Sequence, residues 1–369
     1  METERYSRQI ILKSFGLSAQ QQLLQAKVLV IGAGGLGCPA LQYLAAAGVG
    51  HIGVIDDDTV SLSNLHRQIL FSTADIDTLK AETARRKLQE LNPTITVVSY
   101  TERLKQENIL ELLRRYDYIV DATDNFESRY LINDACALLQ KPLIFAAVSG
   151  YEGQLAVFNV LHDGQTTNYR DLFPIAPAKG EIPNCAENGV LGVLAGTVGT
   201  MQASEVIKLI TGIGKPLIST LLTYNMLNHQ FYEVALFPAG GTYKLPETET
   251  EFLKMNYNYT NEIETHSFIE IDTDKMDALM KAGSTLLIDV REAHESPALN
   301  PIEYQQAPMS SFNEFLNREV DAQNLVLICQ HGIRSVTAAE ALKNKYGATK
   351  NIFSLKGGIA RYRNYFTNK

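Results

Sequence analysis

The first 235 residues alternate short apolar runs with amphipathic stretches. The apolar runs begin at Lys27, His51, Thr94, Asp117 and Pro142. They are apolar on both faces and rich in β-branched residues, which predicts buried strands. Helical spacing covers residues 36–47, 74–91 and 126–139. Strands that are buried on both faces and separated by helices predict a mostly parallel sheet with helices on both sides.

The pattern changes twice farther along the chain. Residues 154–160 and 221–234 alternate apolar and polar positions, which predicts antiparallel strands that extend the sheet. Residues 237–266 are polar, contain a glycine pair and prolines, and have no period, as expected of a linker. New apolar runs from Thr285, Asn324 and Asn351, with a helical stretch over 335–346, predict a second unit.

The expected fold class is therefore α/β throughout. A Rossmann-like, mostly parallel sheet with an antiparallel extension is followed by a second, smaller α/β domain. The expected boundaries are residues 1–237 for the first domain, 238–262 for the linker and 263–369 for the second domain.

Composition narrows the possible functions. The chain is 45% hydrophobic, which excludes wholesale disorder, and its formal net charge of −8 argues against nucleic-acid binding through a general phosphate field. The start METERYSRQI does not resemble a secretory signal, and no apolar run is long enough to span a membrane. The four cysteines are too few and too scattered for a disulfide scaffold. A soluble cytoplasmic protein is expected.

A glycine-rich loop follows the first predicted strand. In GAGGLG, Gly32 permits a tight turn, Gly34 lets the backbone approach phosphates, and Gly37 allows close helix packing. Asp56 ends the next predicted strand, where its carboxylate can accept hydrogen bonds from ribose hydroxyls. These features predict a nucleotide site, for which NAD or FAD is the default occupant.

Three cations shift the expected ligand toward ATP. Arg67 and Lys80 follow Asp56, and Arg8 lies near the N-terminus. A helix N-terminus supplies only about half a positive charge, so a triphosphate needs additional Arg and Lys groups and a magnesium ion. Asp124 follows a predicted strand and is a candidate Mg²⁺ ligand. Alternatively, the cations are solvated surface charges and Asp124 caps the helix that begins at Phe126.

The motifs around these residues resemble one family. GAGGLG-x-P, D-x-D-x-V-x-x-SNL-x-RQ, the following Lys80 and DATDN-x-x-x-R resemble the MoeB/ThiF family of ubiquitin-activating-like adenylyltransferases. The resemblance covers residues 4–235 and implies adenylation of the C-terminal glycine of a ubiquitin-like sulfur carrier with a Gly-Gly end (MoaD/ThiS-like). The residues that it assigns to MgATP are Gly35, Asp56, Ser63, Asn64, Leu65, His66, Arg67, Lys80, Asp124 and Asn125. Arg8 would reach across a homodimer interface.

The first three cysteines differ in their surroundings. Cys38 and Cys136 lie in helical patterns and are expected to be buried. Cys185 lies in a polar loop segment before an apolar helix, where a thiol pKa can be lowered. It matches a family cysteine that in some relatives links covalently to the carrier.

The chain departs from the family at its zinc site. Many relatives have two C-x-x-C pairs that bind structural zinc. Here residues 168–171 replace the first pair and no C-x-x-C occurs in the chain, so no structural zinc is expected.

Cys329 begins the loop CQHGIRS between a predicted strand and a helix. Backbone N–H groups of such a loop converge on a thiolate, and Arg334 adds positive charge. Together with DVRE (289–292) and LKGGI (355–359), this loop resembles a rhodanese domain over residues 263–369. Gln330 and Tyr362 depart from the usual family residues, which leaves the sulfur donor open.

Both units fit one reaction sequence. The first would form an acyl-adenylate, in which Arg67 and Asp124 act on the phosphates. The second would carry sulfur as a Cys329 persulfide and convert the adenylate to a thiocarboxylate, with Cys185 in a possible acyl-disulfide intermediate. Molybdopterin and thiamine synthesis use such carriers, and a cysteine desulfurase is one possible donor. The alternatives are a Rossmann oxidoreductase, a non-catalytic scaffold that binds a carrier, and a C-terminal unit that is a phosphatase or an inert module.

Overall fold

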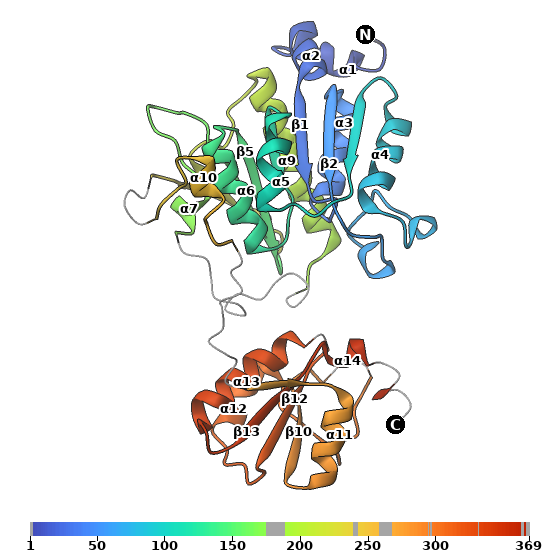
Figure 1. The fold of residues 1–369 in the computed structure, drawn as a ribbon. Coiled ribbons are helices and arrows are strands. Elements are labelled where there is room, and N and C mark those ends of the chain that lie inside the picture. The colour runs from blue at the N-terminus through green and yellow to red at the C-terminus, as the bar shows by residue number, and fades with distance from the viewer. Residues whose placement is uncertain are drawn as a thin grey trace. The chain divides into compact units, whose positions relative to one another are not determined.

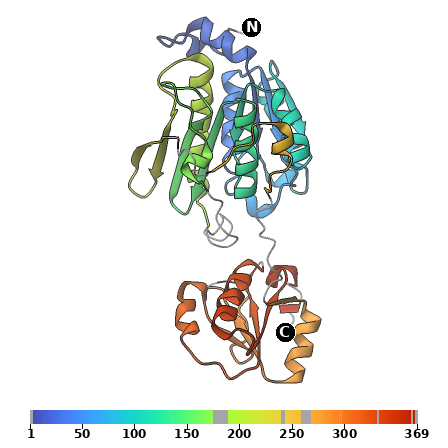
Figure 2. The same ribbon diagram turned by 60° about the vertical axis from the view of Figure 1, so that its left-hand side comes forward.

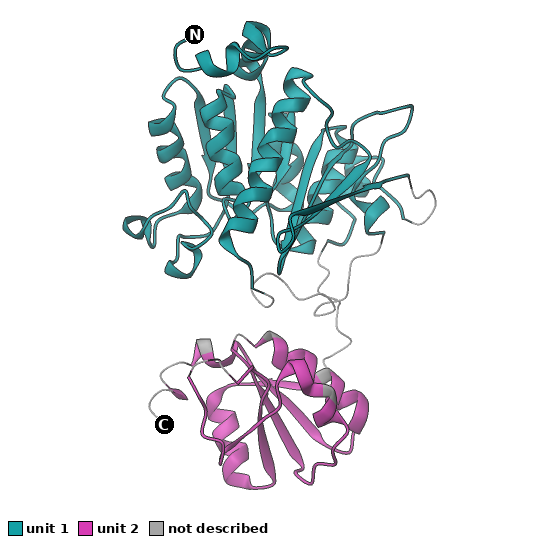
Figure 3. Ribbon diagram, turned by 180° about the vertical axis from the view of Figure 1, so that it is seen from behind, with its two compact units in different colours: residues 1–177, 182–259 teal, residues 178–181, 260–369 magenta. Residues whose placement is uncertain are grey.

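The computed structural model describes residues 3–174, 189–238, 243–257, 268–293, 295, 297–330, 332–362 and 365–366. Two units emerge from the internal contacts (Figures 1 and 3). The first contains the described residues up to 257, and the second contains those from 268 onward. Each unit is described by itself.

The first unit is built on one eight-stranded sheet with the strand order β3-β2-β1-β4-β5-β6-β7-β8. Its strands are β1 (Lys27–Ile31), β2 (His51–Ile55), β3 (Thr96–Tyr100), β4 (Tyr118–Asp121), β5 (Leu143–Ser149), β6 (Glu152–Phe158), β7 (Thr220–Asn225) and β8 (Gln230–Ala235). β1 to β5 are parallel, whereas β6 to β8 are antiparallel and form the edge opposite β3 (Figure 2). Both parts of the predicted sheet are confirmed.

The register of the central strands places their carboxyl ends side by side. Ile31 of β1 pairs with Ile55 of β2 on one side and with Asp121 of β4 on the other. The residues after each strand therefore emerge at one edge of the sheet, where ligands of open α/β sheets bind.

Helices cover both faces of this sheet (Figure 1). They are α1 (Ser7–Ile10), α2 (Gly16–Gln25), α3 (Gly37–Ala47), α4 (Lys80–Leu91), α5 (Gln106–Arg114), α6 (Phe126–Leu138), α7 (Tyr169–Leu172), α9 (Gly192–Thr211) and α10 (Glu249–Phe252). One core joins α2, α3, α4 and α9 to the sheet, and a second core joins α5, α6 and α10 to the opposite face. None of the helices in the described part of the chain combines the length and apolarity that a membrane span requires.

Helix boundaries follow the predictions except at the start of α4. The helix predicted over 74–91 begins only at Lys80, because residues 73–75 form a separate 3₁₀ turn. The Asp75 carboxylate closes that turn by accepting the Ser72 N–H and hydroxyl, each at 2.7 Å. Asp77 then takes a left-handed conformation with φ of 67°, which interrupts the helical path.

Part of the segment expected to be a linker belongs to the first unit. Phe252 and Tyr257 are buried in the core against α5 and α6, although residues 238–262 are expected to connect the domains. Gln106 donates its amide N–H to the Met255 carbonyl at 3.1 Å. The described residues 243–257 are thus a C-terminal extension of this unit. Two isolated aromatic residues without a period anchor it, a pattern that sequence periodicity does not detect.

The second unit contains a five-stranded parallel sheet with the order β11-β10-β12-β13-β9. Its strands are β9 (Ile269–Ile271), β10 (Thr285–Asp289), β11 (Tyr304–Gln306), β12 (Asn324–Ile328) and β13 (Asn351–Leu355). Its helices are α11 (Thr273–Ala282), α12 (Phe312–Leu316), α13 (Ile333–Tyr346) and α14 (Gly358–Arg361). The helices lie on both faces of the sheet, with a separate core on each face, so the predicted second α/β unit is confirmed.

Candidate functional site

The glycine loop between β1 and α3 has the geometry that its sequence requires. Gly32 has φ of 97°, and a Cβ there would lie 2.9 Å from the Ala122 carbonyl oxygen. A Cβ on Gly37 would lie 1.9 Å from the Gly32 oxygen, so the helix could not approach the strand with any other residue. By contrast, the nearest atom to a Cβ on Gly34 is 3.9 Å away. Gly34 therefore leaves its face of the loop open to a ligand.

Asp56 holds this loop against the end of β2. Its two carboxylate oxygens accept the Ala33 N–H at 2.8 Å and the Asp58 N–H at 3.0 Å. Burial raises the pKa of Asp56, and the charge of Lys80 and these N–H donors oppose that rise. Each carboxylate oxygen retains acceptor capacity on the cavity side for hydroxyl donors.

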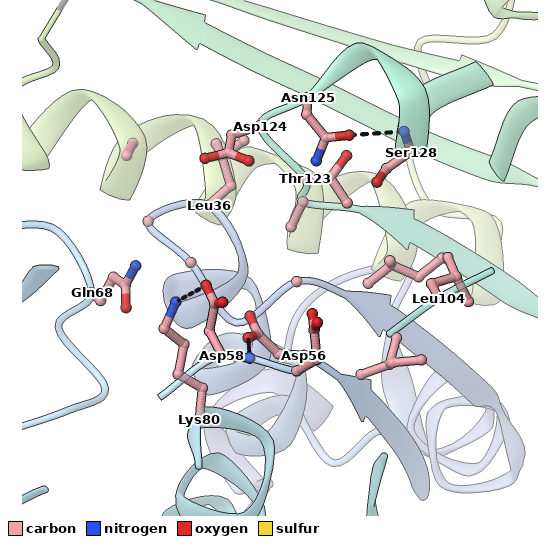
Figure 4. Close-up of a pocket in the computed structure, with 18 of the residues that line it drawn as sticks. Leu36, Asp56, Asp58, Gln68, Lys80, Leu104, Thr123, Asp124, Asn125 and Ser128 are labelled. Atoms are coloured by element: carbon pink, nitrogen blue, oxygen red, sulfur yellow. Dashed lines mark hydrogen bonds and ion pairs between the residues drawn. The ribbon is translucent and has the colours of Figure 1, made fainter. Parts of the chain in front are cut away.

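A cavity of about 380 Å³ lies beside the loop (Figure 4). The predicted residues that line it are Gly32, Gly34, Gly35, Asp56, Arg67, Lys80, Asp124 and Asn125. Additional lining residues, which sequence reasoning missed, include Gln68, Glu102, Arg103, Leu104 and Ser128. Gln68 could have been suggested by its place beside Arg67, whereas the loop 102–104 carries no sequence signal.

Five of the predicted ligand residues do not line this cavity: Arg8, Ser63, Asn64, Leu65 and His66. Arg8 is exposed on α1. The stretch from Ser63 to His66 includes a 3₁₀ turn that leads into Arg67. Within it, the Ser63 carbonyl accepts Arg67 Nη1 at 3.2 Å, and His66 Nε2 lies 2.8 Å from the same nitrogen. In this structure these two residues orient Arg67 and are not part of the cavity wall.

The second cation of the cavity is held by a carboxylate. The Lys80 side chain is only 6% exposed, and its ammonium lies 2.9 Å from Asp58 Oδ2 (Figure 4). Asp58 itself is largely exposed. A buried ammonium with one exposed partner can exchange that partner for another anion, and a phosphate is a stronger competitor than a single carboxylate.

Asp124 and Asn125, which follow β4, have different roles. Asn125, and not Asp124, caps α6 by accepting the Ser128 N–H at 2.9 Å (Figure 4). Asp124 is exposed on the cavity wall and is therefore available to a ligand. Among the described residues, no group of three or more His, Cys, Asp or Glu side chains is arranged to hold a metal. Mg²⁺ does not need such a group, since one carboxylate with nucleotide phosphates and water suffices, and Asp124 fits that donor set.

Two cysteines of the first unit are structural. Cys38 and Cys136 are fully buried, as expected from their helical patterns. Burial raises the pKa of Cys38 to about 12 and also raises that of Cys136, so neither thiol ionises readily. Cys185 lies outside the described residues, and its predicted role stays a prediction.

Cys329 lies at the carboxyl end of β12 and is 1% exposed. Its sulfur accepts the Gly332 N–H at 3.1 Å and lies 3.4 Å from Ser335 Oγ. The Gly357-Gly358 turn packs under the loop so closely that a Cβ on Gly358 would lie 2.4 Å from the Cys329 oxygen. Among the described residues the backbone donor to the sulfur is the Gly332 N–H, while the thiol itself donates to the Ser335 hydroxyl; the convergence of several N–H groups on a thiolate stays a prediction.

Arg334 has a different environment from the one expected. Its guanidinium binds both carboxylate oxygens of Glu295 at 2.5 and 2.7 Å, which neutralises much of its charge. These hydrogen bonds raise the pKa of Arg334. Burial acts to raise the pKa of Glu295, but the hydrogen bonds from Arg334 outweigh burial and lower the pKa of Glu295.

A second arginine supports the Cys329 loop. Arg291 is 1% exposed, pairs with Asp289 and donates to Gln330 Oε1 at 3.3 Å.

Comparisons with known proteins agree with both units. The ThiF family matches residues 6–241, and the Rhodanese-like domain matches residues 272–365. The Probable adenylyltransferase/sulfurtransferase MoeZ of Mycobacterium tuberculosis is 39% identical over 366 residues, which cover 98% of this chain and 93% of that protein. The Sulfur carrier protein adenylyltransferase of Thermus thermophilus is 51% identical over 237 residues, covering 64% of this chain and 88% of that protein.

A solved structure supports the fold. The crystal structure of E. coli MccB with ATP has a TM-score of 0.55 at 23% identity, over 66% of this chain and 74% of that one. At this identity the likeness shows the fold alone. By contrast, MoeZ, which matches this chain over nearly its whole length, is named as an adenylyltransferase and sulfurtransferase. The chain therefore belongs to the ThiF family and carries a rhodanese-like domain on the same polypeptide.

Proposed function

We propose that this enzyme uses ATP to adenylate the C-terminal glycine of a ubiquitin-like sulfur carrier and then converts the adenylate to a thiocarboxylate. The observation that carries this proposal is the cavity in which an open glycine loop meets Arg67, Lys80 and Asp124. A redox dinucleotide does not need two cations and a carboxylate at its phosphates, whereas the larger negative charge of a triphosphate requires them. The names of the relatives MoeZ and sulfur carrier protein adenylyltransferase support both the reaction and the partner.

The chain's residues have distinct tasks toward ATP. Asp56 accepts the ribose hydroxyls, and the backbone at Gly34 and Gly35 approaches the phosphates. Lys80 leaves Asp58 to bind the phosphates, together with Arg67. Asp124 would hold Mg²⁺, which when bound neutralises phosphate charge.

The adenylation step needs no protein base. The carrier carboxylate attacks the α-phosphorus, a P–O bond forms, and pyrophosphate leaves with the electron pair of the broken P–O bond. The barrier is largely repulsion between the anionic nucleophile and the anionic phosphate, so fixed cations and orientation lower it. The product is a mixed anhydride whose acyl carbon is open to attack by sulfur.

Sulfur transfer would use a persulfide on Cys329. The terminal sulfur attacks the acyl carbon and AMP leaves, which gives an acyl disulfide between the carrier and Cys329. A second thiolate then attacks the Cys329 sulfur and releases the thiocarboxylate; we propose Cys185 for this step, whereas the family resemblance implies only that Cys185 links covalently to the carrier. A disulfide between the two cysteines remains, and a cellular dithiol must reduce it.

The finer assignments belong to the same proposal. We infer a homodimer in which Arg8 serves the partner's cavity, a Gly-Gly carrier of molybdopterin or thiamine synthesis, and a persulfide donor such as a cysteine desulfurase. They rest on the resemblance of the motifs, and on the exposure of Arg8 away from its own cavity.

The test is ATP–pyrophosphate exchange by the full chain with each candidate carrier, followed by the intact mass of the carrier. We expect exchange with one carrier, and carrier-AMP and thiocarboxylate masses after a sulfur donor is added. Lys80→Met should lower exchange by at least 100-fold, whereas Lys254→Met, at an exposed lysine of the same unit, should not. Absence of exchange with every Gly-Gly carrier, or a bound redox coenzyme in the absorbance spectrum, would overturn the proposal.

A further inference from the structure

One buried polar side chain in the cavity wall has unmet bonding capacity. Gln68 is 3% exposed and lines the cavity beside Lys80 (Figure 4). Its backbone N–H is bonded to the Asn64 carbonyl at 3.0 Å. Its side-chain oxygen Oε1, however, is buried and has no hydrogen-bond partner among the residues that the structure describes.

Such a group is unusual and requires an explanation. Buried amides in folded proteins are nearly always hydrogen-bonded, because leaving one unpaired incurs its full desolvation cost. Gln20 of the same unit shows the ordinary arrangement. It is also buried, its Nε2 donates to the Ala47 carbonyl at 3.1 Å, and its Oε1 accepts from Gln9. Gln68 therefore differs from Gln20 in having an unpaired amide oxygen, and from Gln202, whose buried Oε1 is also unpaired, in lining a cavity where a ligand can supply the missing bond.

The position of the amide indicates which part of a ligand it meets. Gln68 Nε2 is the nearest atom to a Cβ built on Gly34, at 3.9 Å, so it faces the open stretch of the glycine loop. Leu104 and Ser128 line another part of the same cavity, away from Gln68 in the view of Figure 4. Gln68 thus lies with Lys80 and the glycine loop, the groups that suit phosphates, and apart from the apolar wall that suits a base.

We propose that Gln68 is a phosphate-binding residue of the adenylation site, an inference that rests on the proposed function. Nε2 donates to a phosphate oxygen seated over Gly34. Lys80, drawn from Asp58 to the same phosphate, supplies the donor that Oε1 lacks. A neutral amide suits this place because it adds a directed hydrogen bond without a third cation, which would hold the released pyrophosphate too tightly.

The test uses the opposite effects that this arrangement predicts in Gln68→Met. Without ATP, the melting temperature of the full chain should stay equal or rise, since an unpaired buried amide is replaced by an apolar group of similar shape. With ATP, the stabilising shift should fall by at least half, while the shift caused by adenosine, which has no phosphates, is unchanged. The kcat/KM of ATP–pyrophosphate exchange should fall about 10- to 100-fold, as for one lost bond to a charged group. Gln68→Glu, which keeps the shape and adds negative charge, should lose more.

Gln20→Met is the matched control. It removes a fully paired buried amide, so its melting temperature should fall while its ATP-induced shift remains. A lower melting temperature for Gln68→Met with a normal ATP response would assign Gln68 a structural role and overturn the inference, as would unchanged exchange. A wild-type chain that neither binds ATP nor exchanges pyrophosphate would overturn the proposed function itself, which is a different outcome.

Discussion

The guanidinium of Arg170 binds the carboxylate of Asp134 through two hydrogen bonds of 2.7 Å, from Nε to Oδ1 and from Nη2 to Oδ2. The Tyr257 hydroxyl donates to the same carboxylate at 3.0 Å, and the guanidinium lies 4.8 Å from the centre of the Tyr130 ring. All of these groups are buried or nearly so. One ion pair thus joins α6, α7 and the C-terminal extension of the first unit.

Breaking this pair should destabilise the first unit strongly. Arg170→Met leaves the Asp134 carboxylate buried without its cation, and such losses typically cost about 3–5 kcal/mol. Urea denaturation followed by tyrosine fluorescence measures the change. Glu90→Gln removes an exposed i,i+4 partner of Arg86 and should cost at most about 0.5 kcal/mol. Equal changes in the free energy of unfolding for the two variants would show that the buried pair stabilises the unit no more than an exposed pair.

The same region should not need a metal. The family resemblance implies that residues 168–171 replace a zinc-binding C-x-x-C pair. Here Asn168 N–H bonds Asp171 Oδ2 at 2.8 Å, and the Tyr243 hydroxyl bonds Asp171 Oδ1 at 2.6 Å. We expect that a chelator leaves the melting temperature unchanged and that elemental analysis finds no stoichiometric zinc. Loss of stability on chelation would contradict this, because structural zinc contributes to folding directly.

Sequence reasoning predicted the parts of the site that lie on regular elements. Strand ends in a parallel sheet are aligned by register, so Gly32, Asp56 and Asp124 could be placed together from the pattern alone. Phe252 and Tyr257 escaped prediction because two aromatic residues in a polar segment form no period. Gln68 escaped it because its unmet bonds become evident only when its neighbours in space are known.

Asp75 should make the stability of the first unit depend on pH. Burial acts to raise its pKa, but hydrogen bonds from Lys87 and Ser72 outweigh burial and lower the pKa from 3.8 to about 2. The ionised form is therefore favoured by folding. Its contribution, about 2 kcal/mol, is complete above pH 4 and is lost as the pH falls toward 2. Asp75→Asn should be less stable than wild type by this amount at pH 7 in urea denaturation, and the difference should shrink below pH 4.

Asp163→Asn, at a carboxylate whose side chain is 92% exposed, is the control and should show no such trend. A stability difference for Asp75→Asn that grows as the pH falls would have the wrong sign and would refute this assignment.

Cys329 should be separable from adenylation. Cys329→Ala removes the sulfur that accepts the Gly332 N–H, so persulfide formation should be lost entirely. ATP–pyrophosphate exchange should stay within about twofold of wild type, because every described residue that lines the cavity belongs to the first unit. Thiosulfate–cyanide sulfur transfer and exchange, measured on one preparation, give both values. Loss of exchange in Cys329→Ala would indicate that the two activities are coupled.

Glu295 should decide which sulfur donors the second unit accepts. Its two bonds to Arg334 neutralise a guanidinium of the Cys329 loop and are the main cause of that guanidinium's raised pKa. A dianionic donor such as thiosulfate must therefore approach the loop with little help from this cation. Glu295→Gln keeps the size of the side chain but removes its charge, which restores the positive field at the loop.

We expect kcat/KM for thiosulfate to rise about fivefold to tenfold in Glu295→Gln, through KM and mainly at low salt, since the gain is electrostatic and is screened by ions. Sulfur transfer from a desulfurase persulfide, which brings less charge to the loop, should change by less than about twofold. Arg334→Met made alone leaves the Glu295 carboxylate unpaired and should lower thiosulfate use, and made together with Glu295→Gln it should abolish the gain, because the gain depends on the freed guanidinium. An increase that survives in the double variant would instead indicate that Glu295 acts by itself, as a negative charge that repels the donor.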